Sequence, residues 1–319
     1  MKSNLPTPVA VLGLGTMGHG IAQTFAAAGV EVRGYDEVAA ARDNLYERIE
    51  SNLRQMAEAG LVEISAIATT LARVEVYDSE EDAVRPAQFV IEAVAEDLPL
   101  KQALFERLES FVSPQTIVAT NSSSCQASQC AVNMKQPQRA VAAHWFNPPH
   151  IVPVVEVVPG ERTSPETVDT TIEVLKGIGK VPIRLNMELD GFLVNRIQVA
   201  MHREVWDLME RGVASPDQID AAVRGSIGIR LAAAGPLAIC DFGGLDILAR
   251  VYERLAPQIR SDTTVPESLS ELDKKGDLGL KTGKGIYEYP PDRAEAAKNE
   301  RDERLLALVK MFCGGKREA

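Results

Sequence analysis

The feature that most constrains the fold of this chain is an alternation of short β-rich runs with longer segments of helical length. Between residues 7 and about 185, runs such as Val9-Ala-Val-Leu-Gly and Phe89-Val-Ile-Glu-Ala-Val alternate with helical patterns such as residues 18–28 and 100–111. Parallel strands need a crossover connection, usually a helix, so this alternation predicts βαβ units. The β-rich runs begin at residues 9, 30, 73, 89, 116, 139, 154 and 181. We therefore expect an α/β fold with a doubly wound, mainly parallel sheet.

The character of the sequence changes near Asp190. After that residue almost every periodic stretch has helical spacing, and we predict helices over residues 192–211, 215–224, 241–255, 267–274 and 291–310. A chain of 319 residues is also longer than one core usually serves. The sequence therefore predicts two domains: residues 1–189, which carry the sheet, and residues 190–319, which form an all-α domain.

One insertion stands out in the first domain. The segment between residues 37 and 72 is longer than one crossover helix requires, and Leu45, Ile49, Leu53 and Met56 recur in it at helical spacing. We predict a projecting pair of helices here that serves a function or an interface.

Charge and composition exclude several classes of partner. The chain has 34 Lys and Arg against 45 Asp and Glu, a formal charge of −11, which disfavours binding to nucleic acid or to an anionic membrane. The longest apolar run, residues 231–240, is too short for a membrane helix, and residues 1–6 lack the apolar region of a secretory signal. We expect a cytoplasmic protein that binds neither nucleic acid nor a membrane.

The cysteines and histidines do not have the spacing of a metal site, so we predict none. In a reducing cytosol the cysteines are expected to be free thiols. They are Cys125, Cys130, Cys240 and Cys313.

A glycine-rich turn follows the first strand and opens a helix: Gly13-Leu-Gly15-Thr16-Met17-Gly18. In that setting Gly13 permits the tight turn, Gly15 lets a pyrophosphate approach the backbone, and Gly18 lets the helix pack on the strand. The free N–H groups at the start of the helix would hold the phosphates. The alternative is a glycine-rich turn without a ligand. We predict a Rossmann-like dinucleotide site.

The second strand ends in Asp36, 23 residues after Gly13. A carboxylate at that point can accept hydrogen bonds from both ribose hydroxyls of NAD and would repel the 2′-phosphate of NADP. Asp36 could instead be a simple turn or helix-cap residue. We predict NAD as the cofactor.

His144 ends one strand, and Glu156 lies within the next, after the turn at Pro148-Pro149. Such a turn can bring the Glu156 carboxylate against the His144 ring. Hydride transfer from a secondary alcohol needs a base for the hydroxyl proton, and histidine suits that role. A carboxylate behind the ring would fix its tautomer. By spacing alone, a buried structural histidine beside an unrelated glutamate is equally compatible with the sequence.

Five ordered motifs together resemble the L-3-hydroxyacyl-CoA dehydrogenase family. They are Gly13-Leu-Gly-Thr-Met-Gly18, Asn121-Ser-Ser-Ser124, His144-Trp-Phe-Asn147-Pro, Glu156, and Asp190-Gly-Phe-Leu-Val-Asn195-Arg. The resemblance extends through Gly276-Asp-Leu-Gly-Leu-Lys-Thr-Gly-Lys-Gly-Ile-Tyr287 and so spans nearly the whole chain. It implies a Rossmann-like domain joined to a helical dimerisation domain, and hence a homodimer.

The resemblance also implies roles for individual residues. His144 would be the general base and Glu156 its orienting partner, while Ser123 and Asn195 would bond the reacting oxygen. Asn147 would help to place the substrate or the nicotinamide. Glu96 and Lys101 match family positions near the nicotinamide ribose, although from sequence alone they would be a helix-start acid and a surface lysine. The expected cofactor contacts are Gly13, Gly15, Thr16, Met17, Gly18, Asp36, Glu96, Lys101 and Asn121.

Members of this family that use acyl-CoA carry a lysine-rich helix after the second strand, in which a serine and a lysine contact CoA. Here the matching segment, residues 38–59, has no lysine, and Asn52 and Ala59 occupy those two positions. Other details, such as Asn147-Pro-Pro, resemble the branch of L-gulonate 3-dehydrogenase and lambda-crystallin. The absence of the lysine-rich helix and of its two CoA-contacting residues favours a small free acid over a CoA thioester as the substrate.

Arg230, in Gly228-Ile-Arg-Leu-Ala-Ala-Ala-Gly-Pro236, is a further candidate for substrate binding. On a loop entering the second domain, its guanidinium could hold a free carboxylate through two hydrogen bonds. An interdomain or dimer salt bridge is an equally good interpretation.

The sequence thus predicts an NAD-dependent oxidation of the 3-hydroxyl of a small free L-3-hydroxy acid, such as L-gulonate or 3-hydroxybutyrate. An L-3-hydroxyacyl-CoA dehydrogenase is the alternative, and a non-enzymatic, crystallin-like NAD-binding protein is a more remote one. The glycine turn also resembles β-hydroxyacid dehydrogenases, but those use a catalytic lysine where this chain has Asn195 and Arg196.

Overall fold

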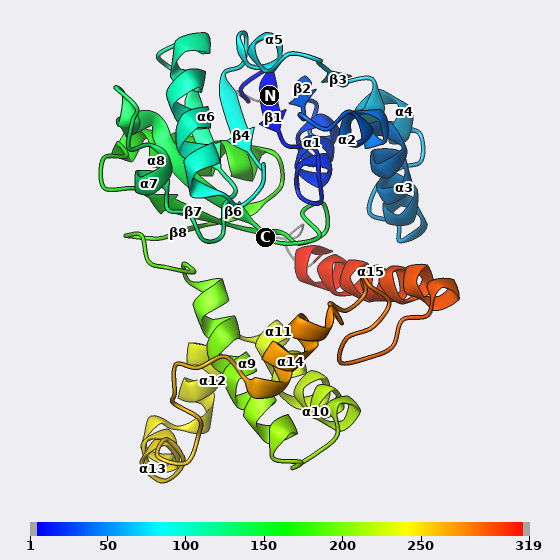
Figure 1. Cartoon of the computed structure of the whole chain (residues 1–319), viewed down its shortest axis with the longest axis vertical. Helices are drawn as coiled ribbons and strands as arrows, with labels where there is room; N and C mark the ends of the chain where they lie inside the picture. The colour runs from blue at the N-terminus through cyan, green and yellow to red at the C-terminus, as the bar shows by residue number, and fades with distance from the viewer. Residues whose placement is uncertain (1–4, 315–319) are drawn as a thin grey trace. The chain divides into compact units, whose positions relative to one another are not determined.

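An eight-stranded sheet forms the centre of the first part of the chain (Figure 1). The computed structural model describes residues 5–314, with side chains as far as Phe312. The strand order is β3-β2-β1-β4-β5-β6-β7-β8, and every neighbouring pair is parallel except β6 with β7. The predicted mainly parallel, Rossmann-like sheet is therefore confirmed. The strands are β1 (Val9–Leu12), β2 (Val32–Tyr35), β3 (Val74–Val76), β4 (Phe89–Glu92), β5 (Ile117–Thr120), β6 (Ala140–Trp145), β7 (Val154–Pro159) and β8 (Val181–Arg184).

Helices cover both faces of this sheet, which is why its central strands are buried on both sides. Val9 and Val11 point into a core shared with the first helix, while Ala10 and Leu12 point into a second core beside Leu104. The helices of this part are α1 (Gly18–Ala27), α2 (Ala39–Asp43), α3 (Leu45–Glu58), α4 (Ala66–Leu71), α5 (Glu80–Val84), α6 (Leu98–Phe111), α7 (Ala127–Cys130) and α8 (Pro165–Gly177).

The expectation of a projecting helical pair is wrong for α3. Its apolar residues Leu45, Ile49 and Leu53 lie one helical turn apart and are all buried in the core of the sheet. α3 packs against α1 and α4 instead of standing away from them. The apolar stripe read from the sequence is real, and burying it against α1 is more favourable than exposing it.

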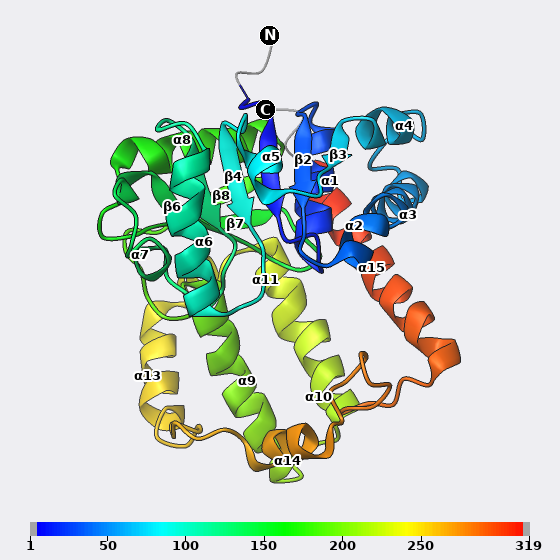
Figure 2. The same ribbon diagram turned by 45° about the horizontal axis from the view of Figure 1, so that its top comes forward.

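By internal packing the chain divides into two units. Residues up to Asn195 and residues from Asp302 onward form the first, and Arg196–Arg301 form the second. The second unit contains helices and no strand among its residues, all of which the structure describes (Figure 2). The remaining helical elements are α9 (Val194–Glu210), α10 (Pro216–Ala222), a π-helical turn (Val223–Gly228), α11 (Ile229–Ala233), α12 (Pro236–Gly243), α13 (Leu245–Leu255), α14 (Glu267–Lys275) and α15 (Pro291–Gly314).

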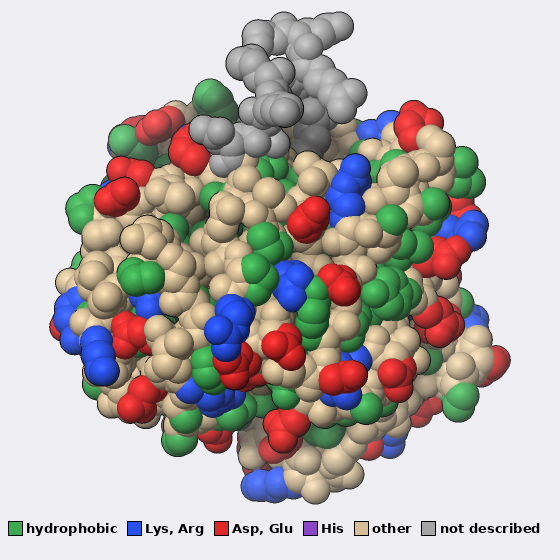
Figure 3. All heavy atoms as spheres, turned by 90° about the horizontal axis from the view of Figure 1, so that it is seen from above, with side chains coloured by type: hydrophobic (Ala, Val, Ile, Leu, Met, Phe, Trp, Pro, Cys, Tyr) green, Lys and Arg blue, Asp and Glu red, His purple; other side chains and the backbone are tan. Residues whose placement is uncertain are grey.

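Within residues 5–314, no helix taken alone has the length and apolar character needed to cross a membrane. A pair bent by 94°, Pro216–Ala233 with Pro236–Gly243, meets that test only when its two parts are combined. Over the face drawn in Figure 3, acidic and basic side chains are interspersed. Cys125, Cys130 and Cys240 are free, and Cys313 lies outside the described side chains.

Candidate active site

The glycine-rich turn joins the end of β1 to the start of α1, and its shape depends on two glycines. A Cβ atom on Gly13, whose φ is +86°, would lie 2.4 Å from the carbonyl oxygen of Ala93. A Cβ atom on Gly18 would lie 1.7 Å from the carbonyl oxygen of Gly13. Gly15 has nothing within 4 Å of its Cβ position. The turn therefore has no room for a side chain at Gly13 or Gly18, while the backbone at Gly15 is accessible. A pyrophosphate could approach the backbone N–H groups at Gly15.

Asp36, at the end of β2, lies directly over this turn. Its Oδ2 accepts a hydrogen bond from Leu14 N at 2.6 Å and its Oδ1 accepts one from Val38 N at 2.8 Å. Asp36 therefore also has the local turn role that was its alternative interpretation. Together with Gly13, Gly15 and Val38 it lines a cavity of about 650 Å³ at the carboxyl ends of β1, β2 and β4. This is where an open α/β sheet with this strand order binds its ligand.

Arg48 is a residue of this site that the sequence interpretation missed. From α3, its Nη1 donates to Leu14 O at 2.9 Å and its Nη2 donates to Gly15 O at 3.1 Å. The same Nη2 lies 2.8 Å from the Nδ1 of His19, the second residue of α1. Burial lowers the pKa of Arg48. The guanidinium ties the glycine-rich turn to α3, and the sequence offered only a position beside the buried Ile49 as a signal.

His144 and Glu156 face each other across the antiparallel pair of β6 and β7, in register. The His144 Nδ1 lies 2.7 Å from the Glu156 Oε2, and both side chains are buried. The other oxygen, Oε1, accepts hydrogen bonds from Leu193 N at 3.1 Å and Val194 N at 2.8 Å. These N–H groups lie at the start of α9, where the helix dipole favours a negative charge. Both carboxylate oxygens of Glu156 therefore have hydrogen-bond partners. In the His144 ring, Nδ1 faces Glu156, so Nε2 is the nitrogen that can contact a substrate.

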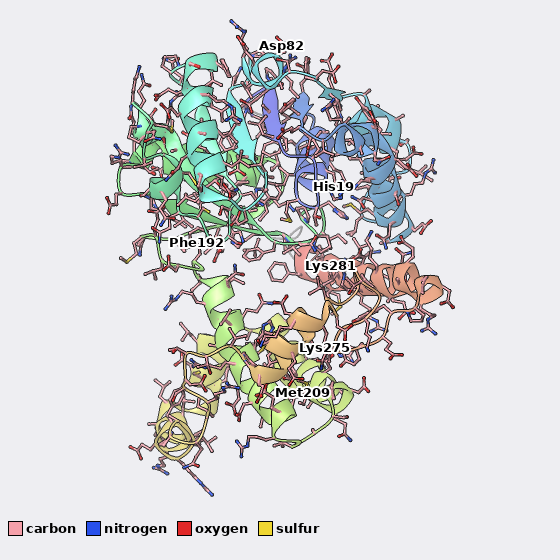
Figure 4. All side chains as sticks on the ribbon, in the orientation of Figure 1. His19, Asp82, Phe192, Met209, Lys275 and Lys281 are labelled. Carbon is pink, nitrogen blue, oxygen red and sulfur yellow. The ribbon has the colours of Figure 1, made fainter. Side chains whose placement is uncertain are left out.

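Two aromatic rings enclose the histidine. Phe146 meets the His144 ring edge-on, with 4.6 Å between centroids, and the centroid of Phe192 lies 5.6 Å away. Phe192 is buried and has a φ of +48°, which is uncommon for a bulky residue. In Figure 4, Phe192 and His19 both lie toward the lower edge of the first unit, where the strands end. Neither phenylalanine was expected from the sequence as part of the site.

The Ser122–Ser124 loop after β5 is organised by Glu96. The Glu96 Oε1 accepts hydrogen bonds from Ser122 Oγ at 2.5 Å and from Ser124 Oγ at 2.8 Å. The same oxygen accepts from the backbone N–H groups of Ser123 and Ser124 at 2.9 Å each. Burial alone would raise the pKa of Glu96, but these hydrogen bonds and the charge of Lys101 lower it to about 2. Glu96 thus positions the backbone of half-buried Ser123.

Lys101 is buried, so its interpretation as a surface lysine is wrong. Its side chain is 1% exposed, and its Nζ lies 2.6 Å from the Glu92 Oε1 and 3.3 Å from the Glu96 Oε2. Glu92, at the end of β4, also accepts from Thr120 Oγ1 at 2.7 Å and Val94 N at 2.8 Å. Burial opposes the charge on Lys101, but Glu92 raises its pKa above the ordinary value. Glu92 was not expected from the sequence; a single acid within an apolar strand was its only signal.

The asparagines differ in how firmly they are held. Asn121 Oδ1 accepts a hydrogen bond from Trp145 N at 2.9 Å and so joins the end of β5 to the residue after His144. Asn147 is exposed beyond the end of β6, and Asn195 is half-buried in the first turn of α9, next to the N–H groups that bind Glu156. Asn121, His144 and Glu156 thus belong to one connected group.

Arg230 does not lie on a loop. It belongs to α11 in the second unit, directly after the π-helical turn, and its guanidinium donates to Ser226 O and Ser226 Oγ at 3.3 Å each. The predicted loop is wrong, because the chain stays helical through Gly225 and Gly228 although glycine lowers helix propensity. Arg230 thus belongs to the second unit, whereas His144 and Glu156 belong to the first.

Residues 8–188 match the family model described as 3-hydroxyacyl-CoA dehydrogenase, NAD binding domain. Residues 191–289 match the C-terminal domain model of the same family. A 5-formyl-3-hydroxy-2-methylpyridine 4-carboxylate 5-dehydrogenase of Mesorhizobium japonicum is 35% identical over 96% of this chain and 98% of its own length. The solved structure of such an enzyme, described as an NAD+ dependent dismutase, matches with a TM-score of 0.90 and 34% identity over 96% of this chain and 98% of that one.

Two further relatives differ in how much of the chain they match. A 3-hydroxybutyryl-CoA dehydrogenase of Clostridioides difficile is 35% identical over 88% of this chain and 99% of its own length. The lambda-crystallin homolog of Homo sapiens is 30% identical over 98% of each.

Proposed function

The chain belongs to the 3-hydroxyacyl-CoA dehydrogenase family and is an NAD-dependent dehydrogenase acting on CH–OH groups, and we propose that its substrate is a small free L-3-hydroxy acid. The reaction would oxidise the 3-hydroxyl to a 3-oxo group and would be reversible. The observation that carries the proposal is the buried His144–Glu156 pair at 2.7 Å, which is suited to removing a hydroxyl proton.

NAD would be held by the turn and cavity at the ends of β1 and β2. Gly13 and Gly18 have no room for a side chain, Gly15 leaves its backbone accessible, and Asp36 lines the cavity. When bound, NAD accepts the hydride that leaves the substrate carbon. Asp36 supports NAD over NADP because a carboxylate repels a 2′-phosphate. A higher kcat/KM with NADP than with NAD would reject this assignment.

In the proposed mechanism His144 takes the hydroxyl proton on Nε2, because Nδ1 is held by Glu156. The Glu156 carboxylate stabilises the imidazolium that forms and keeps the ring oriented. Ser123 and Asn195 would donate to or accept from the oxygen as it changes from hydroxyl to carbonyl, and Asn147 would help to place the substrate. The same histidine returns the proton in the direction of reduction.

Two features support a free acid over a thioester. The segment of α2 and α3 has no lysine, and the exposed side chains of α3 include Glu47 and Glu58. Polyphosphate groups such as those of CoA would meet these carboxylates as readily as the exposed Arg54. The relatives named for 3-hydroxybutyryl-CoA keep the thioester as the second candidate substrate.

One panel of substrates separates the candidates. NADH formation would be followed at 340 nm with L-gulonate, 3-hydroxybutyrate, L-carnitine and 3-hydroxybutyryl-CoA. We expect the highest kcat/KM with one of the free acids. A higher value with the CoA thioester would reject the proposal, and no activity with any of them would favour an NAD-binding protein without catalysis.

Arg230 remains a proposed substrate ligand that binds a carboxylate through two hydrogen bonds. Replacing it with alanine should raise KM for free acids and leave the KM for NAD unchanged. If Arg230→Ala leaves KM for every free acid unaltered, the residue has only its helical contacts with Ser226.

Further proposals concern organisation. The matched family models meet between residues 188 and 191, which supports the domain boundary after residue 189.

Exposed apolar side chains on α12 and α13, such as Leu237, Phe242 and Tyr252, support a homodimer, which analytical ultracentrifugation would detect. The free cysteines fit a cytoplasmic location.

A further inference from the structure

The segment that leads into α9 turns through two residues with left-handed backbone, Gly191 and Phe192. Their φ angles are +74° and +48°, and Phe192 is the one residue other than glycine with a positive φ between residues 5 and 314. Glycine adopts such an angle without strain, whereas a Cβ atom opposes it. The ring of Phe192 must therefore contribute more to the structure than its backbone conformation costs.

The ring of Phe192 packs on the face of the sheet that carries His144 and Glu156. It is 1% exposed and shares an apolar cluster with Ala142 and Val158. Ala142 lies two residues before His144 on β6, and Val158 lies two residues after Glu156 on β7, so these four side chains share one face. The centroid of the Phe192 ring is 5.6 Å from that of His144. The ring thus covers the pair on this face.

The turn at Phe192 also directs the next two backbone N–H groups toward Glu156. Leu193 N and Val194 N donate to the Glu156 Oε1 at 3.1 Å and 2.8 Å. Val194 is the first residue of α9, and N–H groups at the start of a helix have no partner within the helix itself. The carboxylate therefore satisfies these donors, and the donors stabilise its negative charge.

Charged side chains near the pair are few. Within the described part of the chain, Glu156 has His144 as its charged partner, and His144 has Glu156. The nearest charges along the segment are Asp190 and Arg196, and the Asp190 Oδ1 accepts from Gln126 Nε2 at 2.9 Å. The start of α9 thus acts on Glu156 through its backbone donors.

We propose that Phe192 is a positioning residue that holds the start of α9 on Glu156, and that this contact sets the pH at which His144 takes up a proton. Without a bound proton the pair has a net negative charge, and with one it is neutral. Donors to the carboxylate favour the negative form. Moving them away should therefore let His144 take up a proton at a higher pH, so that less of it is available as a base. This inference rests on the proposed role of His144.

The contribution of one N–H group is tested at Val194. Val194→Pro removes a donor to the Glu156 Oε1, and proline is tolerated at the first position of a helix. Val194→Ala also loses the valine side chain but keeps the N–H group, so the difference between the two variants isolates the hydrogen bond.

The readout is the protonation of His144, followed by ¹⁵N NMR of the histidine rings in protein without NAD. The signal of His144 is the one that is absent from His144→Gln. We expect the midpoint of its titration to lie about half a pH unit higher in Val194→Pro than in Val194→Ala. The same midpoint in both variants would overturn the proposal.

The contribution of the ring is tested at Phe192. Phe192→Ala should raise the midpoint for His144 and lower kcat about tenfold, and Phe192→Leu should recover part of both losses. Phe89→Ala is the control, because Phe89 is also 1% exposed but is the first residue of β4, at the opposite end of the strand from the site. It should cost stability and leave the midpoint unchanged.

The remaining outcomes are also decisive. If Phe192→Ala has the midpoint and kcat of Phe89→Ala, Phe192 is a core residue without a positioning role. Should Phe192→Ala not fold, the comparison of Val194→Pro with Val194→Ala decides. Full activity of His144→Gln would reject the proposed function, whereas the NMR midpoints need no substrate and would still show whether the start of α9 acts on the pair.

Discussion

Two buried glutamates, Glu92 and Glu156, show how the partner of a carboxylate decides its use. Both are fully buried on strands of the same sheet, Glu92 on β4 and Glu156 on β7. Glu92 pairs with Lys101 at 2.6 Å, and Glu156 pairs with His144 at 2.7 Å. Each also accepts backbone N–H groups. The main difference between the two sites is the side chain that pairs with the carboxylate, a lysine in one and a histidine in the other.

The difference lies in whether the partner can release a proton near neutral pH. A buried lysine that is paired with a carboxylate stays charged, so the Glu92–Lys101 pair holds β4, β5 and α6 together without changing state. A histidine can be neutral or charged, so the Glu156–His144 pair can take up a proton and return it. The first pair is therefore a scaffold, and the second is suited to catalysis.

The largest expected effect is on kcat and tests the catalytic role of the His144–Glu156 pair. His144→Gln removes the base and should lower kcat by about 10²–10⁴, with the fold intact. His202→Gln is the control, because His202 is an exposed histidine on α9 in the second unit. Steady-state NADH formation at 340 nm measures both. Equal rates in wild type and His144→Gln would remove His144 from the mechanism.

The structural role of the Glu92–Lys101 pair is tested by measuring the free energy of unfolding. Lys101→Met leaves Glu92 buried without its cation, which should cost about 3–5 kcal/mol in the free energy of unfolding by urea, without NAD. The exposed pair of Lys176 and Glu173 supplies the control, since Lys176→Met should change stability by less than about 1 kcal/mol. Adding Glu92→Leu to Lys101→Met should recover part of the loss, because no unpaired charge then remains. If the two lysine variants lose equal stability, the Glu92–Lys101 pair is not a scaffold.

Glu156→Gln separates orientation from charge. The amide oxygen can still accept from the N–H groups of Leu193 and Val194, but the amide NH2 group then faces the His144 Nδ1 in place of the carboxylate oxygen, and the charge behind the ring is lost. We expect kcat to fall by roughly 10- to 100-fold, less than for His144→Gln, with an altered pH profile. A variant with full activity and an unaltered profile would show that His144 acts without an orienting carboxylate.

The sequence predicts the sheet better than it predicts these pairings. All eight β-rich runs become strands, because alternation and β-branched residues are local signals. His144 and Glu156 could be paired from the sequence because a single turn joins their strands. Lys101 could not be paired with Glu92, because α6 must first fold back along β4. The same holds for Arg48, whose partners in the glycine-rich turn lie more than thirty positions away.

The smallest expected effect concerns Glu96, which combines features of both glutamates because it contacts Lys101 and also shapes the loop that carries Ser123. Its pKa is lowered to about 2, so its charged form stabilises the fold above its ordinary pKa, and this contribution is lost as the pH falls toward 2. Its side chain is 39% exposed, so solvent screens part of the effect. Glu96→Gln should therefore lower stability on the order of 1 kcal/mol at pH 7, or roughly 2–4 °C in Tm.

The pH dependence distinguishes this role from simple loss of packing. Thermal unfolding of wild type and Glu96→Gln, without NAD, should show the gap in Tm narrowing as the pH is lowered from 5 toward 3, because the wild-type carboxylate then becomes protonated in the unfolded chain. Glu161→Gln, at an exposed glutamate, is the control and should change Tm at pH 7 by less than Glu96→Gln does. A gap for Glu96→Gln that stays constant from pH 7 to pH 3 would mean that its charge contributes nothing. The serine loop would then be held by hydrogen-bond geometry alone, and the electrostatic contrast between scaffold and catalytic carboxylates would apply only to Glu92 and Glu156.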